Sequence, residues 1–115
     1  MTRIEALQEQ PEAVEIKMAD GIFIKQMSLP RAGMFVLQHV HAYDHTSMLA
    51  TGSVRMWRNG VCVGDFKAPT GIMVLAGVEH QFQSLVPDTL IYCIHNISRT
   101  GAVDVLGQPV SAEVE

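Results

Sequence analysis

Apolar and polar side chains alternate with a period of two over most of the chain, which is the pattern of strands with one buried face. In the first such segment, Val14, Ile16 and Met18 alternate with Glu15 and Lys17. Nine glycines and five prolines divide the chain into short segments. The pattern predicts strands at Val14 to Met18, Ile22 to Leu29, Met34 to His41, Val54 to Arg58, Val61 to Phe66, Ile72 to Leu75, His80 to Leu85 and Leu90 to Ile97.

Turn residues separate these segments. Asn59-Gly60 is the strongest hairpin signal, because both central positions of its turn need a positive φ. Asp20-Gly21 and Pro87-Asp88 mark two further turns. A helical pattern occurs only from Arg3 to Gln10, and Pro11 ends it, so no helix is long enough to connect parallel strands. We therefore predict an all-β fold, a sandwich or barrel of about eight antiparallel strands.

Length and composition fit one domain. The chain has 115 residues, of which 48% are hydrophobic and 17% charged, enough for a core and too apolar for disorder throughout. We expect an N-terminal extension at residues 1–11, a β-barrel domain at residues 12–106 and a C-terminal tail at residues 107–115. The tail is small, polar and acidic, so we expect it to fray.

Charge, hydropathy and cysteine content exclude several classes of protein. Eight Lys and Arg against twelve Asp and Glu give a net charge of −4, which provides no basic surface for nucleic acid. The longest apolar run, Ile72 to Val78, is shorter than the roughly 20 residues of a membrane span, and the acidic N-terminus does not resemble a signal peptide. Two cysteines without a CxxC pair indicate a reducing, cytoplasmic compartment.

Histidine is the residue type with an unusual distribution, since three of the five histidines fall within seven residues. His39 and His41 share one face of a predicted strand, about 6.6 Å apart, so both imidazoles can reach one ion. His45 follows after a spacing that lets the chain return a third ring, and His80 begins another predicted strand. The alternatives are a solvated loop, or an outward-facing His45 that leaves three ligands.

The spacing around these histidines resembles the two motifs of the cupin superfamily. The segment Gly33-x5-His39-x-His41-x3-His45-x6-Gly52 matches the first motif, G-x5-H-x-H-x3,4-E-x6-G, with His45 in the glutamate position. Gly77-x2-His80 matches part of the second motif, G-x5-P-x-G-x2-H-x3-N, in which Leu75 replaces the proline and Ser84 the asparagine. The upstream glycine of that motif is out of place. The resemblance covers residues 33 to 84.

The resemblance implies a cupin-type double-stranded β-helix, a jelly-roll barrel that holds one metal ion. His39, His41 and His80 take the positions of the family's histidine ligands and His45 that of the glutamate, which makes the site similar to that of the four-histidine monocupins. It implies one divalent transition metal per chain, manganese first, with iron, nickel, zinc and copper as alternatives. It also implies a homodimer, paired through strands of the segment Val14 to Leu29.

The histidine in the glutamate position changes the charge of such a site. Four neutral imidazoles leave a divalent ion with its full charge, whereas a carboxylate ligand would neutralise half of it. In a barrel of low dielectric constant that cation attracts anionic or enolate-like ligands. We therefore expect a small anionic, dicarbonyl or sugar-acid ligand.

His95 and Cys93 are the candidate catalytic residues outside the ligand set. Period two puts Ile91, Cys93 and His95 on one face of their strand, and Tyr92 and Ile94 on the other. If the first face is inward, Cys93 lies near the metal pocket and His95 near its rim, as an acid, a base or an anion contact. The alternative for Cys93 is a small buried hydrophobic residue.

Other residues are expected to be structural. We expect Cys62, Met48 and Met73 to pack in the core, and Arg55 and Arg58 to lie on the surface beside the hairpin turn.

Two functions are compatible with these observations. The first is a metal-dependent enzyme, an isomerase, lyase or dioxygenase, in which the ion binds two oxygens of a small substrate. The second is a non-catalytic module that binds a metal or a sugar, or serves as a sensor or structural part, because one fold hosts many functions.

Overall fold

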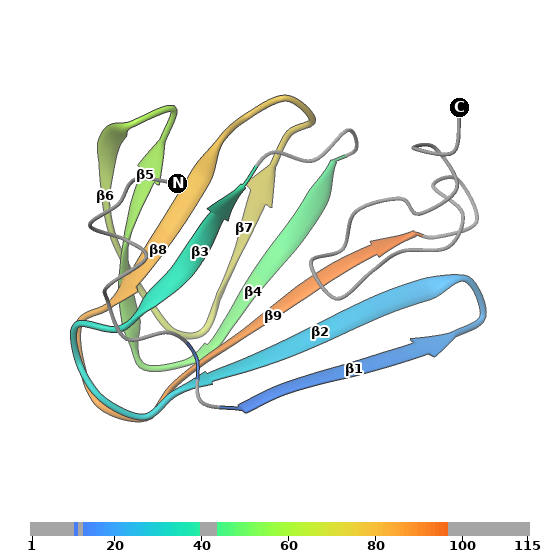
Figure 1. Cartoon of the computed structure of the whole chain (residues 1–115), viewed down its shortest axis with the longest axis horizontal. Coiled ribbons are helices and arrows are strands. Elements are labelled where there is room, and N and C mark those ends of the chain that lie inside the picture. The colour runs from blue at the N-terminus through green and yellow to red at the C-terminus, as the bar shows by residue number, and fades with distance from the viewer. Residues whose placement is uncertain (1–10, 12, 40–43, 97–115) are drawn as a thin grey trace.

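The computed structural model describes residues 11, 13–39 and 44–96, which form two antiparallel sheets (Figure 1). The larger sheet has the strand order β1-β2-β9-β4-β7 and the smaller sheet the order β3-β8-β5-β6. The predicted all-β fold class is therefore confirmed. The strands are β1 (Ala13–Ala19), β2 (Ile22–Leu29), β3 (Phe35–His39), β4 (His45–Thr51), β5 (Ser53–Arg58), β6 (Val61–Lys67), β7 (Thr70–Val74), β8 (His80–Ser84) and β9 (Thr89–Asn96).

The hydrophobic core lies between the two sheets, and both contribute to it. On β2 every second residue from Phe23 to Leu29 is buried, as the alternating sequence predicts. Each fully buried aliphatic or aromatic side chain stabilises the fold by about 1.5–3 kcal/mol. The core cluster consists of Met27, Leu29, Met34, Val36, Leu49, Val54, Met56, Ile72, Val74, Phe82 and Ile91.

Eight strands coincide with predicted segments to within two residues at either end. The sequence pattern does not predict β4, although this strand lies between β9 and β7 in the larger sheet. Its apolar and polar residues do not follow the alternation of buried and exposed positions, because the polar Ser47 is buried while the apolar Met48 is exposed. Tertiary pairing with two flanking strands, rather than its own pattern, makes this segment a strand.

Some expectations concern residues outside the described part of the chain: the helical pattern at Arg3 to Gln10, the tail at 107–115, and the end of the predicted strand Met34 to His41, with the candidate ligand His41. Across residues 11, 13–39 and 44–96, no helix is long and apolar enough to cross a membrane.

Three residues expected in the core lie outside it. Met48 and Met73 are 37% and 55% exposed on the outer face of the larger sheet, because their strands bury Leu49 and Val74 instead. Cys62 is exposed on β6, which is an edge strand of the smaller sheet. Apolar composition alone did not reveal which face of these strands points inward.

The predicted turns are present. Asp20 and Gly21 have φ values of 50° and 76°, and Asn59 and Gly60 have values of 49° and 80°. Two consecutive residues with positive φ produce the tight turn whose twist matches that of the flanking strands.

Gly52, which closes the first motif, makes a close backbone approach between β4 and β5. Its φ is 84°, and a Cβ atom built on it would lie 2.8 Å from the Cα of Thr89, a fully buried residue. A side chain at this position would force the two segments apart, so glycine is required here for both conformation and space.

Ser84, which stands in the asparagine position of the second motif, anchors the chain before β3. Its buried hydroxyl accepts a hydrogen bond from the Met34 amide (2.9 Å) and donates one to the Arg31 carbonyl (2.7 Å). The residue thus fixes the entry of the strand that carries His39.

Candidate metal centre

Two of the predicted ligands, His45 and His80, lie side by side between the sheets. His45 begins β4 in the larger sheet and His80 begins β8 in the smaller one. Their ring centroids are 5.0 Å apart, and the exposed fractions of the two residues are 4% and 1%. Both ring nitrogens of His45 and Nδ1 of His80 are inaccessible to solvent. His45 therefore faces inward, and the alternative of an outward ring does not hold.

His39 is the cross-strand partner of His80, and a β-bulge sets this pairing. Val36 pairs with Phe82, but the next pairing joins His39 to His80, so β3 has one extra residue between the two. Regular pairing would have put Gln38 opposite His80 instead. Bulges of this kind re-aim a strand next to functional sites. The ends of β3 and β7 and the starts of β4 and β8 meet at this end of the barrel (Figure 1).

His41 lies outside the described residues, so the four-histidine set is present only in part. Within residues 11, 13–39 and 44–96, no group of three or more His, Cys, Asp or Glu side chains is placed to hold a metal ion. The full ligand set stays a prediction.

The imidazole nitrogens of His45 and His80 are suitable ligands for a first-row transition metal. Neutral imidazole is a preferred ligand of manganese, iron, nickel, copper and zinc in proteins. Two imidazoles bound cis to one ion at about 2.1 Å would place their ring centroids roughly 4.5–5.3 Å apart. The 5.0 Å separation of His45 and His80 lies within this range.

Arg58 borders the same end of the barrel and is not on the open surface as expected. It is half-buried and pairs across strands with His80, so the two share a face. Its guanidinium donates a hydrogen bond to the Met73 carbonyl (3.3 Å), which links β5 of one sheet to β7 of the other. Sequence reasoning missed this placement, because it expected Arg58 to lie on the surface beside the hairpin turn that follows it.

Arg55 is exposed, as expected, and forms a salt bridge of 2.8 Å with Asp65 on the neighbouring strand. The hydrogen bond from Arg55 lowers the pKa of the Asp65 carboxyl. This pair lies on the outer face and contributes little at a solvated surface.

His95 and Cys93 share a face of β9 with Ile91, as period two predicted, and this face points into the barrel. His95 is buried, its ring lies 4.8 Å from that of Phe23, and burial lowers its pKa. The Cys93 thiol packs against the core and lies 3.8 Å from the Ser47 hydroxyl. Burial raises the pKa of this thiol despite opposing effects of Ser47 and Lys25, so the neutral form prevails at pH 7.

Lys25 is an interior residue that sequence reasoning did not single out. It is 8% exposed and faces inward between Phe23 and Met27 on β2. The strict alternation of that strand could have revealed it, since the inward positions read Phe, Lys, Met and Leu.

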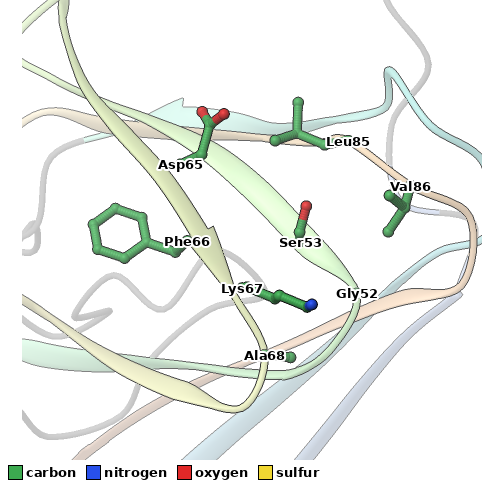
Figure 2. A pocket seen from close by; sticks show the side chains of 8 residues that line it. All are labelled: Gly52, Ser53, Asp65, Phe66, Lys67, Ala68, Leu85 and Val86. Carbon is green, nitrogen blue, oxygen red and sulfur yellow. The ribbon is translucent and has the colours of Figure 1, made fainter.

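A separate surface pocket of about 400 Å³ lies at the opposite end of β4 and β8 from the histidines. Figure 2 shows its lining, which comes from the β4–β5 turn, the end of β6 and the segment after β8. Asp65 and Lys67 contribute opposite charges there, and Asp65 is already engaged by Arg55. The pocket therefore offers no concentrated charge or nucleophile.

Comparisons with known proteins place this geometry in a fold family. No protein-family model and no curated protein matches the sequence. KdgF from Halomonas sp. superposes with a TM-score of 0.61 and 16% identity, covering 70% of this chain and 74% of that one. A cupin-2 domain protein from Shewanella frigidimarina superposes with a TM-score of 0.59 and 16% identity, covering 79% of this chain and 86% of that one.

An RmlC-like cupin with a double-stranded β-helix fold from Methanocaldococcus jannaschii gives a TM-score of 0.62 and 17% identity, covering 73% of this chain and 78% of that one. At these identities the likeness concerns the backbone arrangement. It shows that the chain folds as the double-stranded β-helix barrel of the cupin proteins.

Proposed function

We propose that this protein binds one divalent transition metal in its barrel, through His39, His41, His45 and His80. The observation that carries the proposal is the pair of buried imidazoles of His45 and His80, brought together from different sheets at a separation suited to one ion. Two neutral buried imidazoles in contact contribute little to a hydrophobic core compared with apolar side chains, whereas they are well suited to ligation.

Manganese is the first candidate, followed by iron, nickel, zinc and copper. A site made of imidazoles leaves the charge of the ion uncompensated, which favours a small anionic, dicarbonyl or sugar-acid ligand. Of the described acidic residues, Glu15, Asp20, Asp44, Asp65 and Asp88 are exposed and Glu79 is half-buried, so none is a buried neutraliser. Asp44, the nearest in sequence to His45, accepts a hydrogen bond from the Ala76 amide instead.

The first function that we propose is an isomerase, lyase or dioxygenase that acts on such a ligand. When bound, the metal would supply a Lewis acid that polarises substrate oxygens. Among the described residues, His95 is a buried histidine outside the proposed ligand set and the candidate acid or base, and Cys93 is a neutral thiol on the same face of β9.

A non-catalytic module that binds a metal or a sugar is the second candidate, and one observation favours it. No described carboxylate is buried beside His45 and His80, so general acid–base chemistry has few participants besides His95. The two free cysteines fit a reducing, cytoplasmic location for either function.

Elemental analysis of the purified protein tests metal binding directly. We expect close to one transition-metal ion per chain, and reconstitution of chelated protein with manganese, iron, nickel or zinc to restore it. Metal-loaded protein is then assayed against panels of dicarbonyls and sugar acids. Turnover identifies the enzyme, and saturable binding without turnover identifies the binding module. Failure of every one of these metals to bind would refute the metal-dependent enzyme and the metal-binding module.

A further inference from the structure

Arg58 is a basic residue that the fold places next to a proposed ligand of the metal. On β8, His80 has His39 as its cross-strand partner on one side and Arg58 of β5 on the other. Arg58 shares the inner face of β5 with the buried Val54 and Met56. Directly opposite residues on one face have Cβ atoms about 4.5–5.5 Å apart, so the side chain of Arg58 starts close to that of His80.

Two hydrogen bonds fix the end of β5 against the start of β8. The Asn59 amide donates to the Glu79 carbonyl (2.7 Å), and the Glu79 amide donates to the side-chain oxygen of Asn59 (3.0 Å). Asn59 directly follows Arg58 and Glu79 directly precedes His80, so these bonds hold the pairing of Arg58 with His80. A backbone that is held in place before binding favours ligand binding, because less conformational freedom is lost.

The guanidinium of Arg58 reaches the opposite sheet at the level of His45. Its Nη2 donates a hydrogen bond to the carbonyl of Met73 on β7 (3.3 Å), and the next residue, Val74, is the cross-strand partner of His45. Arg58 therefore starts beside one buried histidine and ends beside the strand that pairs with the other. Its bond to Met73 is longer than the usual range of about 2.7–3.2 Å, and it uses one of the five N–H groups of a guanidinium.

The charge of Arg58 is not neutralised by a neighbouring acid. In the part of the chain that the structure describes, no carboxylate forms a salt bridge with Arg58, whereas Arg55 on the outer face of the same strand is paired with Asp65. A half-buried guanidinium attracts an anion more strongly than one in bulk water does. An anion between Arg58 and a divalent ion is attracted by both, whereas the two cations alone repel each other.

The shape of the guanidinium favours one class of anion. Its planar N–H groups form two parallel hydrogen bonds with the oxygens of a carboxylate. We propose that Arg58 binds the carboxylate of a small ligand whose adjacent hydroxyl or carbonyl oxygen lies at the metal, so that the site selects 2-hydroxy and 2-oxo acids over neutral dicarbonyls. This inference rests on the proposed metal-binding function and adds a specificity residue to it.

Isothermal titration of the metal-loaded protein with lactate and with lactamide tests the proposal. In lactamide an amide replaces the carboxylate, while the hydroxyl and carbonyl oxygens stay. Arg58→Met should weaken lactate binding by roughly ten- to a hundredfold, which is the range of one hydrogen-bonded charge pair. Lactamide should behave the same in the wild-type protein and in the variant. Arg58→Lys should retain part of the lactate affinity, since it keeps the charge but loses the planar pair of donors.

Metal content separates this role from a purely structural one. If Arg58 only held β5 to β7, its loss would loosen this end of the barrel and lower the affinity for metal as well as for lactate. If it binds the ligand, Arg58→Met should hold at least as much metal as the wild-type protein, because a repelling positive charge is removed. Arg55→Met is the matched control on the outer face of the same strand, and it should change neither affinity.

A second measurement needs no variant and applies even if Arg58→Met does not fold. Phenylglyoxal modifies arginine side chains, and tandem mass spectrometry reports each arginine separately. In metal-loaded wild-type protein, lactate should protect Arg58 and leave Arg55 unprotected, while lactamide should protect neither. Equal protection of both arginines by lactate, or protection of neither, would contradict the proposal.

The outcomes separate the two claims. If wild-type protein holds no metal, the proposed metal binding fails and the role of Arg58 fails with it. If it holds metal but does not bind lactate, or if Arg58→Met binds lactate equally well, the assignment of Arg58 is overturned while metal binding stands. Loss of metal from Arg58→Met likewise overturns the assignment in favour of a structural role.

Discussion

The imidazole rings of His45 and His80 lie 5.0 Å apart, although 35 positions separate the two residues in the sequence and each belongs to a different sheet. Stacked sheets are about 10 Å apart, so inward side chains from both meet midway. The histidine pair is therefore a product of the packing of the whole barrel, and its geometry depends on the relative position of both sheets.

Metal binding should raise the thermal stability of the wild-type protein. At a free metal concentration about a hundred times Kd, ligation stabilises the native state by about 2.7 kcal/mol, which raises Tm by roughly 10 °C in a domain of this size. His45→Ala and His80→Ala should abolish this increase, and the loss of affinity should exceed the roughly 10–100-fold typical of an outer-shell partner. Differential scanning calorimetry with and without manganese measures the shift.

The matched control for these variants is His95→Gln, which changes the one histidine outside the proposed ligand set. Its Tm should still rise with metal. A metal-dependent shift that persists in His80→Ala, or one that disappears only in His95→Gln, would show that the ligands are assigned incorrectly.

Gly52→Ala should destabilise the fold much more than Gly60→Ala. Both glycines have φ near 80°, so both substitutions incur a left-handed backbone cost of about 1–2 kcal/mol. At Gly60 a Cβ atom meets nothing within 4 Å, whereas at Gly52 it meets the backbone of Thr89. We expect a further loss of about 1–3 kcal/mol at Gly52, measured by urea denaturation. Equal losses would mean that the approach of Thr89 is unimportant.

The two cysteines should react very differently with iodoacetamide. Cys62 is exposed, whereas the Cys93 thiol packs against the core with a pKa raised by burial. Because the thiolate is the reactive form, alkylation at pH 7.5 should modify Cys62 and spare Cys93 until the protein unfolds. Peptide mapping by mass spectrometry distinguishes the sites, and Cys62→Ser removes the fast reaction. Fast modification of Cys93 in folded protein would contradict its placement.

The raised pKa of Cys93 also makes stability dependent on pH. The native state holds the thiol proton more tightly than the unfolded state, so its contribution is fully present below the unfolded pKa of about 8.5 and declines as pH rises through the folded value. Compared with Cys93→Ala, wild-type protein should lose up to about 1.4 kcal/mol per pH unit in that window. Lys25 and Ser47 face this thiol, so the comparison is made with both residues intact.

The homodimer expected from the resemblance stays a proposal, and β1 is where it can be tested. This strand is the outer strand of the larger sheet, and Val14 and Met18 on it are 51% and 55% exposed. An edge with exposed apolar side chains favours pairing with a second chain. Light scattering after size exclusion should report a dimer that Val14→Lys with Met18→Lys dissociates.

Val61→Lys is the control for this prediction, because Val61 is 65% exposed on β6 at the edge of the other sheet. It should leave the dimer intact. Dissociation by Val61→Lys alone would place the interface on the smaller sheet instead.

Most of the fold was predictable because alternation and turn residues are local signals. The hairpin at Asn59-Gly60 and the shared face of Ile91, Cys93 and His95 on β9 followed directly from neighbouring residues. The strand β4 did not, because its burial pattern includes the polar Ser47 inside and Met48 outside. Its position is determined by β9 and β7, which lie far away in the sequence.

The site was predictable to the extent that residue spacing encodes it. The resemblance of the histidine spacing to the two cupin motifs implied that His45 and His80 belong to one site, and the structure brings these two together. Arg58 and Lys25 were missed for a different reason. Both are charged residues that lie on the inner face of a sheet. The alternation of β2 could have revealed Lys25 as an inward residue. The placement of Arg58 depends on the contact of β5 with β7 of the other sheet, which no local pattern encodes.

Because of the bulge in β3, the position of His39 relative to His80 depends on how many residues separate His39 from Val36, and not on which residues these are. Between the pairings of Val36 and His39 the strand contains Leu37 and Gln38, while its partner contains Gln81 alone. Leu37 and Gln38 together form a spacer that is one residue longer than its counterpart in β8. Removing a single residue from that spacer would move every preceding residue of the strand by one place, or break the histidine pairing, while leaving the composition of the site intact.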